Sequence, residues 1–433
     1  MASKNTHSTP TGDAYDPEKP PHTEDLSPDD EPKIANDYPE GGTQAWLVAA
    51  GTAGVLFATL GYTNSFGVFQ AYYMLHQLQH ETSDRIAWIG SLQAFLIFAT
   101  GCVGGPLFDR YGARVIRPAA ALYVFAIMMT SLCSEYWQFM LAQGVLTGVA
   151  DGLLMFPAMA ATPQYFHKKR GAAMGVAIVG SSVGAIVFPI IMTKMLNESS
   201  LGFGWSVRIV AFIMVPVLVF CSIVIKARLP PRKTTFLLLS AFKEPVYNLL
   251  VIGNLFLMVG MFVPMFFLPA FAIEKGMNDS LAFYLVAMLN GASIPGRIVP
   301  GILADKFGRL NMLFGAGLST SIIILCWSKL SGTAGIIIYT LAFGFCSGTI
   351  VSGGSVALSL VPKNQQEVGT YLGMGMAIAG VSALIGPPAT GALLDRDHNI
   401  HNVAIFAGIC CLGGTMLILW AKMFTEKGIL GKV

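Results

Sequence analysis

Two similar charged turns interrupt an otherwise apolar chain, and their spacing limits what the chain can fold into. The first is Gly105-Pro-Leu-Phe-Asp-Arg-Tyr-Gly-Ala-Arg114, and the second, 196 residues later, is Gly301-Ile-Leu-Ala-Asp-Lys-Phe-Gly-Arg309. In each turn an aspartate follows a glycine by four residues, a cation comes next, and Gly and Arg close the turn. A second set recurs at an offset of 198: Gly171, Gly175 and Pro189 return as Gly369, Gly373 and Pro387. Two repeats of nearly the same period predict two copies of one structural half.

The composition places both halves in a membrane. Hydrophobic residues make up 54% of the 433 residues and charged residues only 12%, whereas soluble domains carry about a quarter charged residues. A helix of about 20 apolar residues crosses a bilayer, and the sequence predicts twelve such spans. They begin near residues 45, 84, 115, 137, 171, 206, 247, 281, 310, 333, 367 and 402. We therefore expect an all-α membrane protein with twelve transmembrane helices in two pseudo-symmetric six-helix bundles.

The distribution of charge predicts the orientation and the limits of the parts. Residues 1–43 hold ten acidic and three basic residues, so we expect a disordered acidic cytoplasmic tail. The parts that follow are a bundle over 44–226, a cytoplasmic linker over 227–246, a second bundle over 247–424 and a cytoplasmic tail over 425–433. Predicted cytoplasmic segments hold 20 Lys and Arg residues, and predicted outer loops hold six. This asymmetry indicates that both termini face the cytosol, in a multi-pass protein of the cell (plasma) membrane.

The paired turn resembles the signature loop of the major facilitator superfamily, which joins the second and third helices of each half. Gly105 and Gly301 let helices approach closely, and the acids Asp109 and Asp305 suit a helix N-terminus. The four cations of the loops hold them on the cytoplasmic side; they are Arg110, Arg114, Lys306 and Arg309. The resemblance implies the fold of that superfamily.

Three further segments resemble the monocarboxylate-transporter (porter) family, and in particular its fungal branch. They are Pro39-Glu-Gly-Gly-Thr-Gln-Ala-Trp46 before the first span, Asn64-Ser-Phe-Gly-Val-Phe-Gln70 and Trp88-Ile-Gly-Ser-Leu-Gln93. The resemblance implies two bundles that rock about a central site. Fungal members of this kind include monocarboxylate and vitamin carriers and exporters of secondary metabolites.

Two ionisable side chains inside predicted spans are functional candidates, because such groups are costly in a membrane. Arg297 lies eight residues before Asp305, about 12 Å along a helix. The monocarboxylate family has an arginine at the matching position, so the resemblance implies a contact with a substrate carboxylate, which a guanidinium fits well. The alternative is a structural role, such as pairing with helix C-terminal carbonyls. Animal lactate carriers have an Asp at the position of Ser293 and a Lys at that of Asn64, which puts proton–lactate symport by their mechanism in doubt.

Asp151 in the fourth span is the proton-coupling candidate, because a buried carboxyl group can load and release a proton. The alternative is a bond to a neighbouring hydroxyl or backbone group, beside the small-residue stripe of Gly144, Gly148 and Gly152. Aromatic residues recur at helical spacing in the first span, among them Tyr62 and Phe66, and suit a ring-bearing substrate. Packing or lipid contact is the alternative for them. Asn64 suits a hydrogen bond to a larger, more neutral substrate.

The sequence thus indicates a secondary transporter of a small organic, carboxylate-bearing metabolite, with efflux of a fungal secondary metabolite favoured. Proton-coupled uptake of a monocarboxylate or vitamin is the alternative, and a transporter-like nutrient sensor is a minor one. No Ser-His-Asp order, nucleotide-binding loop or Cys/His metal spacing is present, so we expect no enzyme activity, no metal and no cofactor. The expected partners are the organic substrate, protons as a candidate coupling ion, and the lipid bilayer, without nucleic acid. The protein is expected to function as a monomer.

Overall fold

The computed structural model describes residues 38–197, 199–230, 238–397, 400–425 and 428, and these residues form helices joined by turns. Tyr38–Val433 is one compact unit, and Met1–Asp37, most of the predicted acidic tail, lies outside the described residues. The last six residues of that predicted tail have a defined place. Helix α2 begins at Gly42, and Glu40 donates its backbone N–H to the carbonyl of Tyr165. Residues 38–43 therefore belong to the folded part, because Glu40 is hydrogen-bonded to the first bundle and α2 already includes Gly42 and Thr43.

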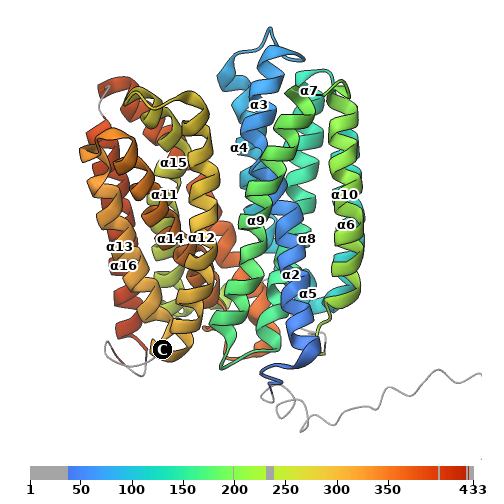
Figure 1. Cartoon of the computed structure of the whole chain (residues 1–433). Helices are drawn as coiled ribbons and strands as arrows, with labels where there is room; N and C mark the ends of the chain where they lie inside the picture. The colour runs from blue at the N-terminus through green and yellow to red at the C-terminus, as the bar shows by residue number, and fades with distance from the viewer. Residues whose placement is uncertain (1–37, 198, 231–237, 398–399, 426–427, 429–433) are drawn as a thin grey trace, which may run out of the picture. The chain divides into compact units, whose positions relative to one another are not determined.

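The first bundle contains the helices up to residue 224, and several spans are broken into pieces (Figure 1). The first span breaks after Thr63, where the Asn64 side chain turns back to the carbonyl of Leu60. The fourth contains a stretch of π-helix, a geometry that often occurs at functional sites. The pieces are α2 (Gly42–Thr63) and α3 (Phe66–Leu75); α4 (Ser83–Ala99) and α5 (Gly101–Tyr111); α6 (Ile116–Thr130); α7 (Tyr136–Phe139), the π-helix Met140–Thr147 and α8 (Gly148–Ala161); α9 (Arg170–Asn197); and α10 (Gly202–Val224).

The second bundle repeats this arrangement with longer continuous helices. Proline residues lie inside α11 and α12 without ending them, as is tolerated where neighbouring helices satisfy the freed backbone groups. The six helices are α11 (Pro245–Glu274), α12 (Asp279–Phe307), α13 (Arg309–Cys326), α14 (Gly332–Leu358), α15 (Val368–Asp397) and α16 (Ile400–Met423).

The prediction of twelve spans is confirmed. Eleven segments in the described ranges are long and apolar enough to cross a membrane. One of them, Arg85–Thr130, has 46 residues, about 69 Å at helical rise and more than twice a bilayer's apolar thickness. Its chain turns at Gly112, whose φ of 63° lies in the region that favours glycine, so this segment supplies two crossings.

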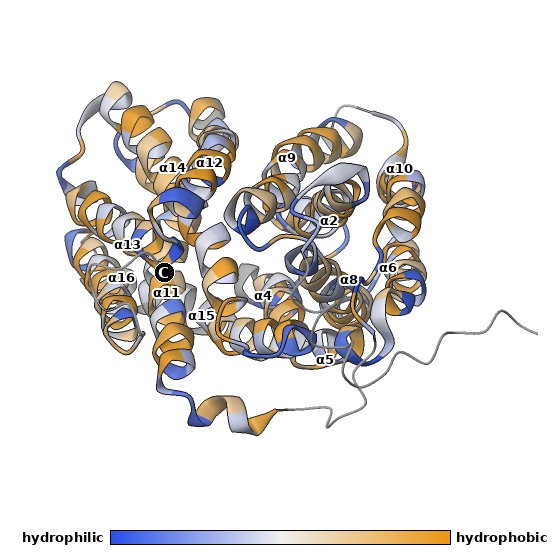
Figure 2. Ribbon diagram, turned by 90° about the horizontal axis from the view of Figure 1, so that it is seen from below, coloured by the Kyte–Doolittle hydropathy of each residue, from blue (hydrophilic) through white to orange (hydrophobic). Residues whose placement is uncertain are grey.

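The two bundles meet mainly through one helix of each. Helix α9 of the first bundle packs on α12 of the second, and α15 of the second packs on α5 and α4 of the first. Figure 2 shows α12 beside α9 and α15 beside α4 in the seam between the bundles. Helix α2 begins and α16 ends at one face, the lower one in Figure 1. We call it the inner face, because the charge distribution predicts it to be cytosolic, and the opposite one the outer face.

The predicted linker over 227–246 is described only in part. Arg228 donates its backbone N–H to the side chain of Gln164 at 2.9 Å, which ties the start of the linker to the first bundle. Residues 231–237 lie outside the described residues, Leu239–Lys243 form a 3₁₀ turn, and α11 begins at Pro245.

Candidate functional site

The first signature loop holds the second bundle through a helix N-terminus. Asp109, near the end of α5, is 5% exposed. One of its carboxylate oxygens accepts the backbone N–H of Gly369 at 3.1 Å, and the other accepts the backbone N–H and hydroxyl of Thr370 at 2.6 and 2.7 Å. These donors open α15, where free N–H groups and the helix dipole favour a negative charge. The carboxylate therefore joins the two bundles at the inner face.

The second signature loop makes the same contact in the opposite direction. The two carboxylate oxygens of Asp305 accept the backbone N–H groups of Gly171 and Ala172, both at 2.9 Å, at the start of α9. Arg309 approaches the same carboxylate at 3.3 Å and also donates to the carbonyl of His167 in the first bundle. The two aspartates are thus related by the internal repeat, each holding a helix of the other bundle.

Glycines at these crossings allow the backbones to meet. A Cβ added at Gly105 would lie 2.0 Å from the carbonyl oxygen of Gly369, and one added at Gly301 would lie 2.7 Å from that of Gly171. Both distances are impossible for real atoms, and the obstacle is backbone rather than a movable side chain. The repeated glycines of the sequence therefore lie in matching positions of the two crossings, α5 against α15 and α12 against α9.

The other loop cations differ in their surroundings. Arg110, Arg114 and Lys306 are exposed at the inner face, and the Arg110 guanidinium lies 5.6 Å from the ring centre of Tyr111. Only Arg309 of the four contacts the opposite bundle in the hydrogen bonds described here. The exposed three add positive charge to the surface predicted to face the cytosol.

Arg170 is a further contact residue that the sequence argument missed. Its side chain is 1% exposed and donates to the carbonyl of Ser359 at 2.8 Å and to the side chain of Gln365 at 3.2 Å, both in the second bundle. It also donates to the carbonyl of Phe166 at 3.0 Å. In the sequence it is one of three consecutive cations, and nothing distinguishes it from its two exposed neighbours. We propose a gating role for these contacts and call the set Asp109, Arg170, Asp305 and Arg309 the inner gate.

Arg297 lies deeper in the seam between the bundles. Its guanidinium is buried at 7% exposure and donates to the carbonyl of Ile178 at 2.7 Å and the hydroxyl of Ser181 at 2.6 Å, both in α9. Its Nε has no hydrogen-bond partner among the described residues. Ser293, one turn away, is bonded to Ser182 of α9 at 2.7 Å. In this conformation Arg297 therefore bonds a carbonyl inside α9 rather than one at a helix C-terminus, and its Nε donor is unused.

The first-span candidates are not brought together with Arg297 by any hydrogen bond described here. Tyr62 is 1% exposed in the core of the first bundle, where its ring meets Phe69 edge-on at 5.4 Å. Phe66 packs over Gly90 of α4. These placements favour packing over a cavity wall for both aromatics. Asn64 is exposed at the helix break and bonds its own helix.

Asp151 belongs to a polar cluster inside the first bundle. The Thr63 hydroxyl donates to one of its carboxylate oxygens at 3.3 Å, and the Gln93 amide donates to that hydroxyl at 3.1 Å. Asp151 and Gln93 are both 0% exposed. Within the described part of the chain, the second carboxylate oxygen of Asp151 and the amide oxygen of Gln93 have no partner. Buried acceptors without donors are costly, so the cluster is suited to taking up a proton or a water molecule.

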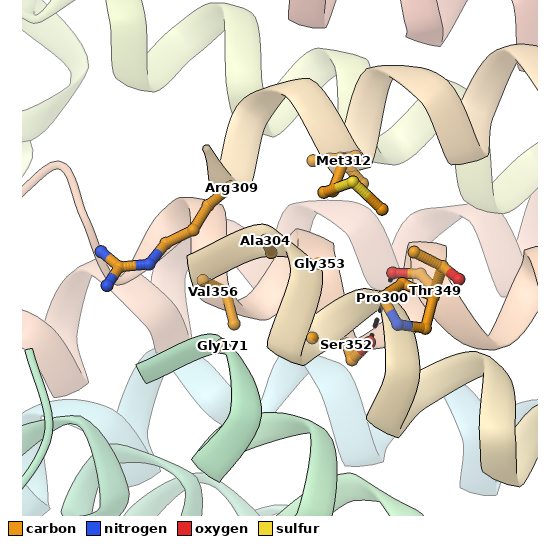
Figure 3. A pocket seen from close by; sticks show the side chains of 11 residues that line it. Gly171, Pro300, Ala304, Arg309, Met312, Thr349, Ser352, Gly353 and Val356 are labelled. Carbon is orange, nitrogen blue, oxygen red and sulfur yellow. Dashed lines mark hydrogen bonds between the residues drawn. The ribbon is translucent and has the colours of Figure 1, made fainter. Parts of the chain in front are cut away.

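A small cavity lies between α9, α12, α13 and α14, close to the inner gate. Figure 3 shows Arg309, Pro300, Thr349 and Ser352 around it. Its volume of about 20 Å³ fits one water molecule and not an organic cargo.

Two six-helix bundles related by an internal repeat and joined by polar contacts along their seam are the architecture of a secondary transporter, a class in which the bundles rock about a central site. The chain belongs to the Major Facilitator Superfamily, whose family description matches residues 51–374 and 301–431. This membership confirms the predicted fold and the expectation of a transporter rather than an enzyme.

Relatives in fungi are similar over most of their length. The aspyridones efflux protein apdF of Emericella nidulans is 48% identical over 402 residues, which cover 93% of this chain and 81% of the relative. The agnestins efflux protein AgnL12 of Paecilomyces divaricatus is 37% identical over 396 residues, 90% of each chain.

Solved structures share the fold at low identity. The human organic anion transporter MFSD10 (TETRAN) has a TM-score of 0.71 at 15% identity, covering 87% of this chain and 100% of that one. The E. coli fucose:proton symporter FucP has a TM-score of 0.68 at 15% identity, covering 86% of this chain and 98% of that one. At these identities the likeness concerns the fold alone.

Proposed function

We propose that this protein exports a small organic, carboxylate-bearing secondary metabolite from a fungal cell by alternating access. The observation that carries the proposal is the inner gate, whose charged groups hold backbone atoms of the opposite bundle and can release them without breaking either bundle. Two relatives that match over nine-tenths of this chain are named as efflux proteins, which supports the outward direction. The protein then lies in the plasma membrane as a monomer with both termini in the cytosol.

We further propose that the chain is a fungal member of the monocarboxylate-transporter family and that Arg297 meets the cargo. Its position one helical turn beyond Ser293 and its unused Nε donor support this role. When the bundles tilt, the bonds from Arg297 to Ile178 and Ser181 lengthen, and a cargo carboxylate can replace them. A planar guanidinium suits that exchange because it binds two carboxylate oxygens at once.

The experiment that tests the function compares intact cells with and without the protein. It follows a labelled short monocarboxylate and the full set of secreted metabolites, each with and without a protonophore. The proposal expects one secreted compound to disappear from the medium and to accumulate inside when the protein is absent. Uptake of the monocarboxylate that depends on the protein, with an unchanged set of secreted compounds, would instead establish the importer. A signal without any flux would establish a nutrient sensor.

Asp151 is proposed to carry the coupling proton. Replacing it with asparagine keeps the Thr63 hydrogen bond and removes the exchangeable proton, so we expect Asp151→Asn to move cargo down its own gradient. Accumulation driven by a pH gradient of one unit in vesicles should fall by up to about tenfold, because one coupled proton supports a concentration ratio of about ten at that gradient. Counterflow of labelled cargo, which needs no gradient, should persist. Gradient-driven transport that survives the change would rule out Asp151 as the coupling group.

A further inference from the structure

The short segment before α2 is hydrogen-bonded to the loop between α8 and α9. One carboxylate oxygen of Glu40 accepts the backbone N–H groups of His167 and Lys168 at 2.8 and 2.6 Å, and the other accepts that of Lys169 at 3.2 Å. The backbone N–H of Glu40 donates to the carbonyl of Tyr165 at 3.1 Å. The ring of Tyr38 stacks on that of His167 at 5.1 Å. One acidic residue thus satisfies three consecutive donors of the loop.

The backbone of Glu40 is held in a disfavoured conformation. Its φ is 52°, and in the described part of the chain it is the one residue other than glycine with a positive φ. Such a conformation is uncommon for a residue with a Cβ and persists only when its surroundings enforce it. Gly41 and Gly42 follow directly and also have positive φ values, and they adopt them without strain. The chain places an acid where a glycine would be easier, which indicates that the carboxylate is needed there.

The loop that Glu40 holds is also the part of the first bundle that the second bundle contacts. Arg309 donates to the carbonyl of His167. Asp305 accepts the N–H groups of Gly171 and Ala172, which follow closely on the three N–H groups bound by Glu40. Two carboxylates therefore share the donors of residues 167–172. The one from Glu40 belongs to the same bundle and remains when the bundles separate, whereas the one from Asp305 leaves.

The surroundings of Glu40 stabilise the negative charge of its carboxylate. Partial burial tends to raise the pKa of its carboxyl group, but the backbone N–H groups of Lys168, Lys169 and His167 outweigh burial and leave the pKa below its usual value. The group is therefore ionised throughout the neutral pH range. Three donors to one carboxylate are charge-assisted hydrogen bonds, which are stronger than neutral ones.

We propose that Glu40 is a positioning residue of the inner gate: it fixes the α8–α9 loop in the one conformation on which Asp305 and Arg309 can dock. Without Glu40 the loop has to be ordered each time the gate closes, and ordering a loop costs conformational entropy. The loss then weakens the closed gate and leaves the open gate unaffected, because in the open gate no partner requires an ordered loop. The role concerns the gate alone and is independent of which cargo is carried.

The test measures how often the inner gate opens in the absence of cargo. Ser359 is 0% exposed beside Arg170, so Ser359→Cys, in a chain whose native cysteines are replaced, reports opening by its rate of reaction with a thiol reagent applied to the inner face. Adding Glu40→Ala is expected to raise that rate roughly tenfold, because ordering the backbone of a single loop residue on gate closure costs about 1–2 kcal/mol and about 1.4 kcal/mol is a factor of ten in an equilibrium. Glu40→Gln keeps an acceptor oxygen, so its labelling rate should lie between that of Glu40→Ala and that of the protein with Glu40 intact.

The matched control is Glu135→Ala. Glu135 also accepts a backbone N–H at a helix start, forming a capping box with Gln138 ahead of α7, but it lies at the outer face and makes no contact with the inner gate. It should leave the labelling rate unchanged. Equal labelling rates in the Glu40→Ala and unaltered proteins would overturn the proposal, as would an equal rise with Glu135→Ala. If Glu40→Ala yields too little folded protein, Glu40→Gln and Glu40→Asp decide by the same reading, since aspartate is too short to reach all three donors.

Discussion

Alanine in place of Gly105 is expected to reduce transport at least about tenfold while leaving the amount of folded protein in the membrane unchanged. The added methyl group would lie 2.0 Å from the carbonyl oxygen of Gly369 and 2.7 Å from its carbon, so one backbone has to move away. Overpacking of this kind costs about 1–3 kcal/mol, and about 1.4 kcal/mol is a factor of ten in an equilibrium. Because the contact exists only when the bundles meet at the inner face, the cost falls on that state alone.

Two comparison variants show whether the effect is confined to the gate. Gly315→Ala in α13 should transport normally, since nothing lies within 4 Å of the added carbon. Gly180→Ala should lose folded protein instead, because its Cβ would lie 1.9 Å from the carbonyl oxygen of Ala53 inside one bundle. The measurements are cargo flux per folded transporter and the thermal stability of the purified protein. Normal flux in Gly105→Ala would show that the gate does not need this close approach.

The second large effect is expected at Arg297. Arg297→Ala removes two buried charge-assisted hydrogen bonds to α9, each worth about 1.5–3 kcal/mol, together with the proposed contact to the cargo. We expect flux to fall by about two orders of magnitude or more at normal membrane abundance. Arg297→Lys keeps the charge but not the planar pair of donors, so it should restore part of the flux with a raised KM.

Arg208→Ala is the matched control for Arg297→Ala. The Nε–H of Arg208 also donates a hydrogen bond to a serine hydroxyl, that of Ser131 at 3.1 Å, but both residues belong to the first bundle. Its loss should leave flux close to normal. Ser181→Ala separates the two roles of Arg297, because it removes one bond between the bundles and leaves the guanidinium free for cargo; we expect an unchanged KM. Normal flux in Arg297→Ala would remove Arg297 from the site.

Much of the fold could be predicted because membrane spans depend on local composition. The predicted starts at 45, 171 and 402 compare with Gly42, Arg170 and Ile400 for α2, α9 and α16. The internal repeat could be predicted as well, because glycine and aspartate residues recur at a constant spacing in the sequence. The sequence could not show that residues 38–43 fold, because a polar segment with two glycines resembles the tail before it.

The contacts of the site were harder to predict, because most of them involve backbone atoms. Arg170 looks like its exposed neighbours Lys168 and Lys169 in the sequence, yet it alone reaches the carbonyl of Ser359. Helical spacing placed Tyr62 on one face of its helix but could not say whether that face meets its own bundle or the seam. Nothing in the sequence around Thr63 indicated that its hydroxyl links Gln93 to Asp151.

Most partners of the inner gate are main-chain atoms. Asp109 and Asp305 bind N–H groups, and Arg170 and Arg309 bind carbonyls of the opposite bundle; the side chains of Thr370 and Gln365 add one hydrogen bond each. A substitution on the partner helix changes a side chain and leaves these atoms in place, as long as the crossing glycines are kept. The inner gate can therefore stay constant while the residues around the central site change. Such a protein can acquire new cargoes by mutation and still close in the same way.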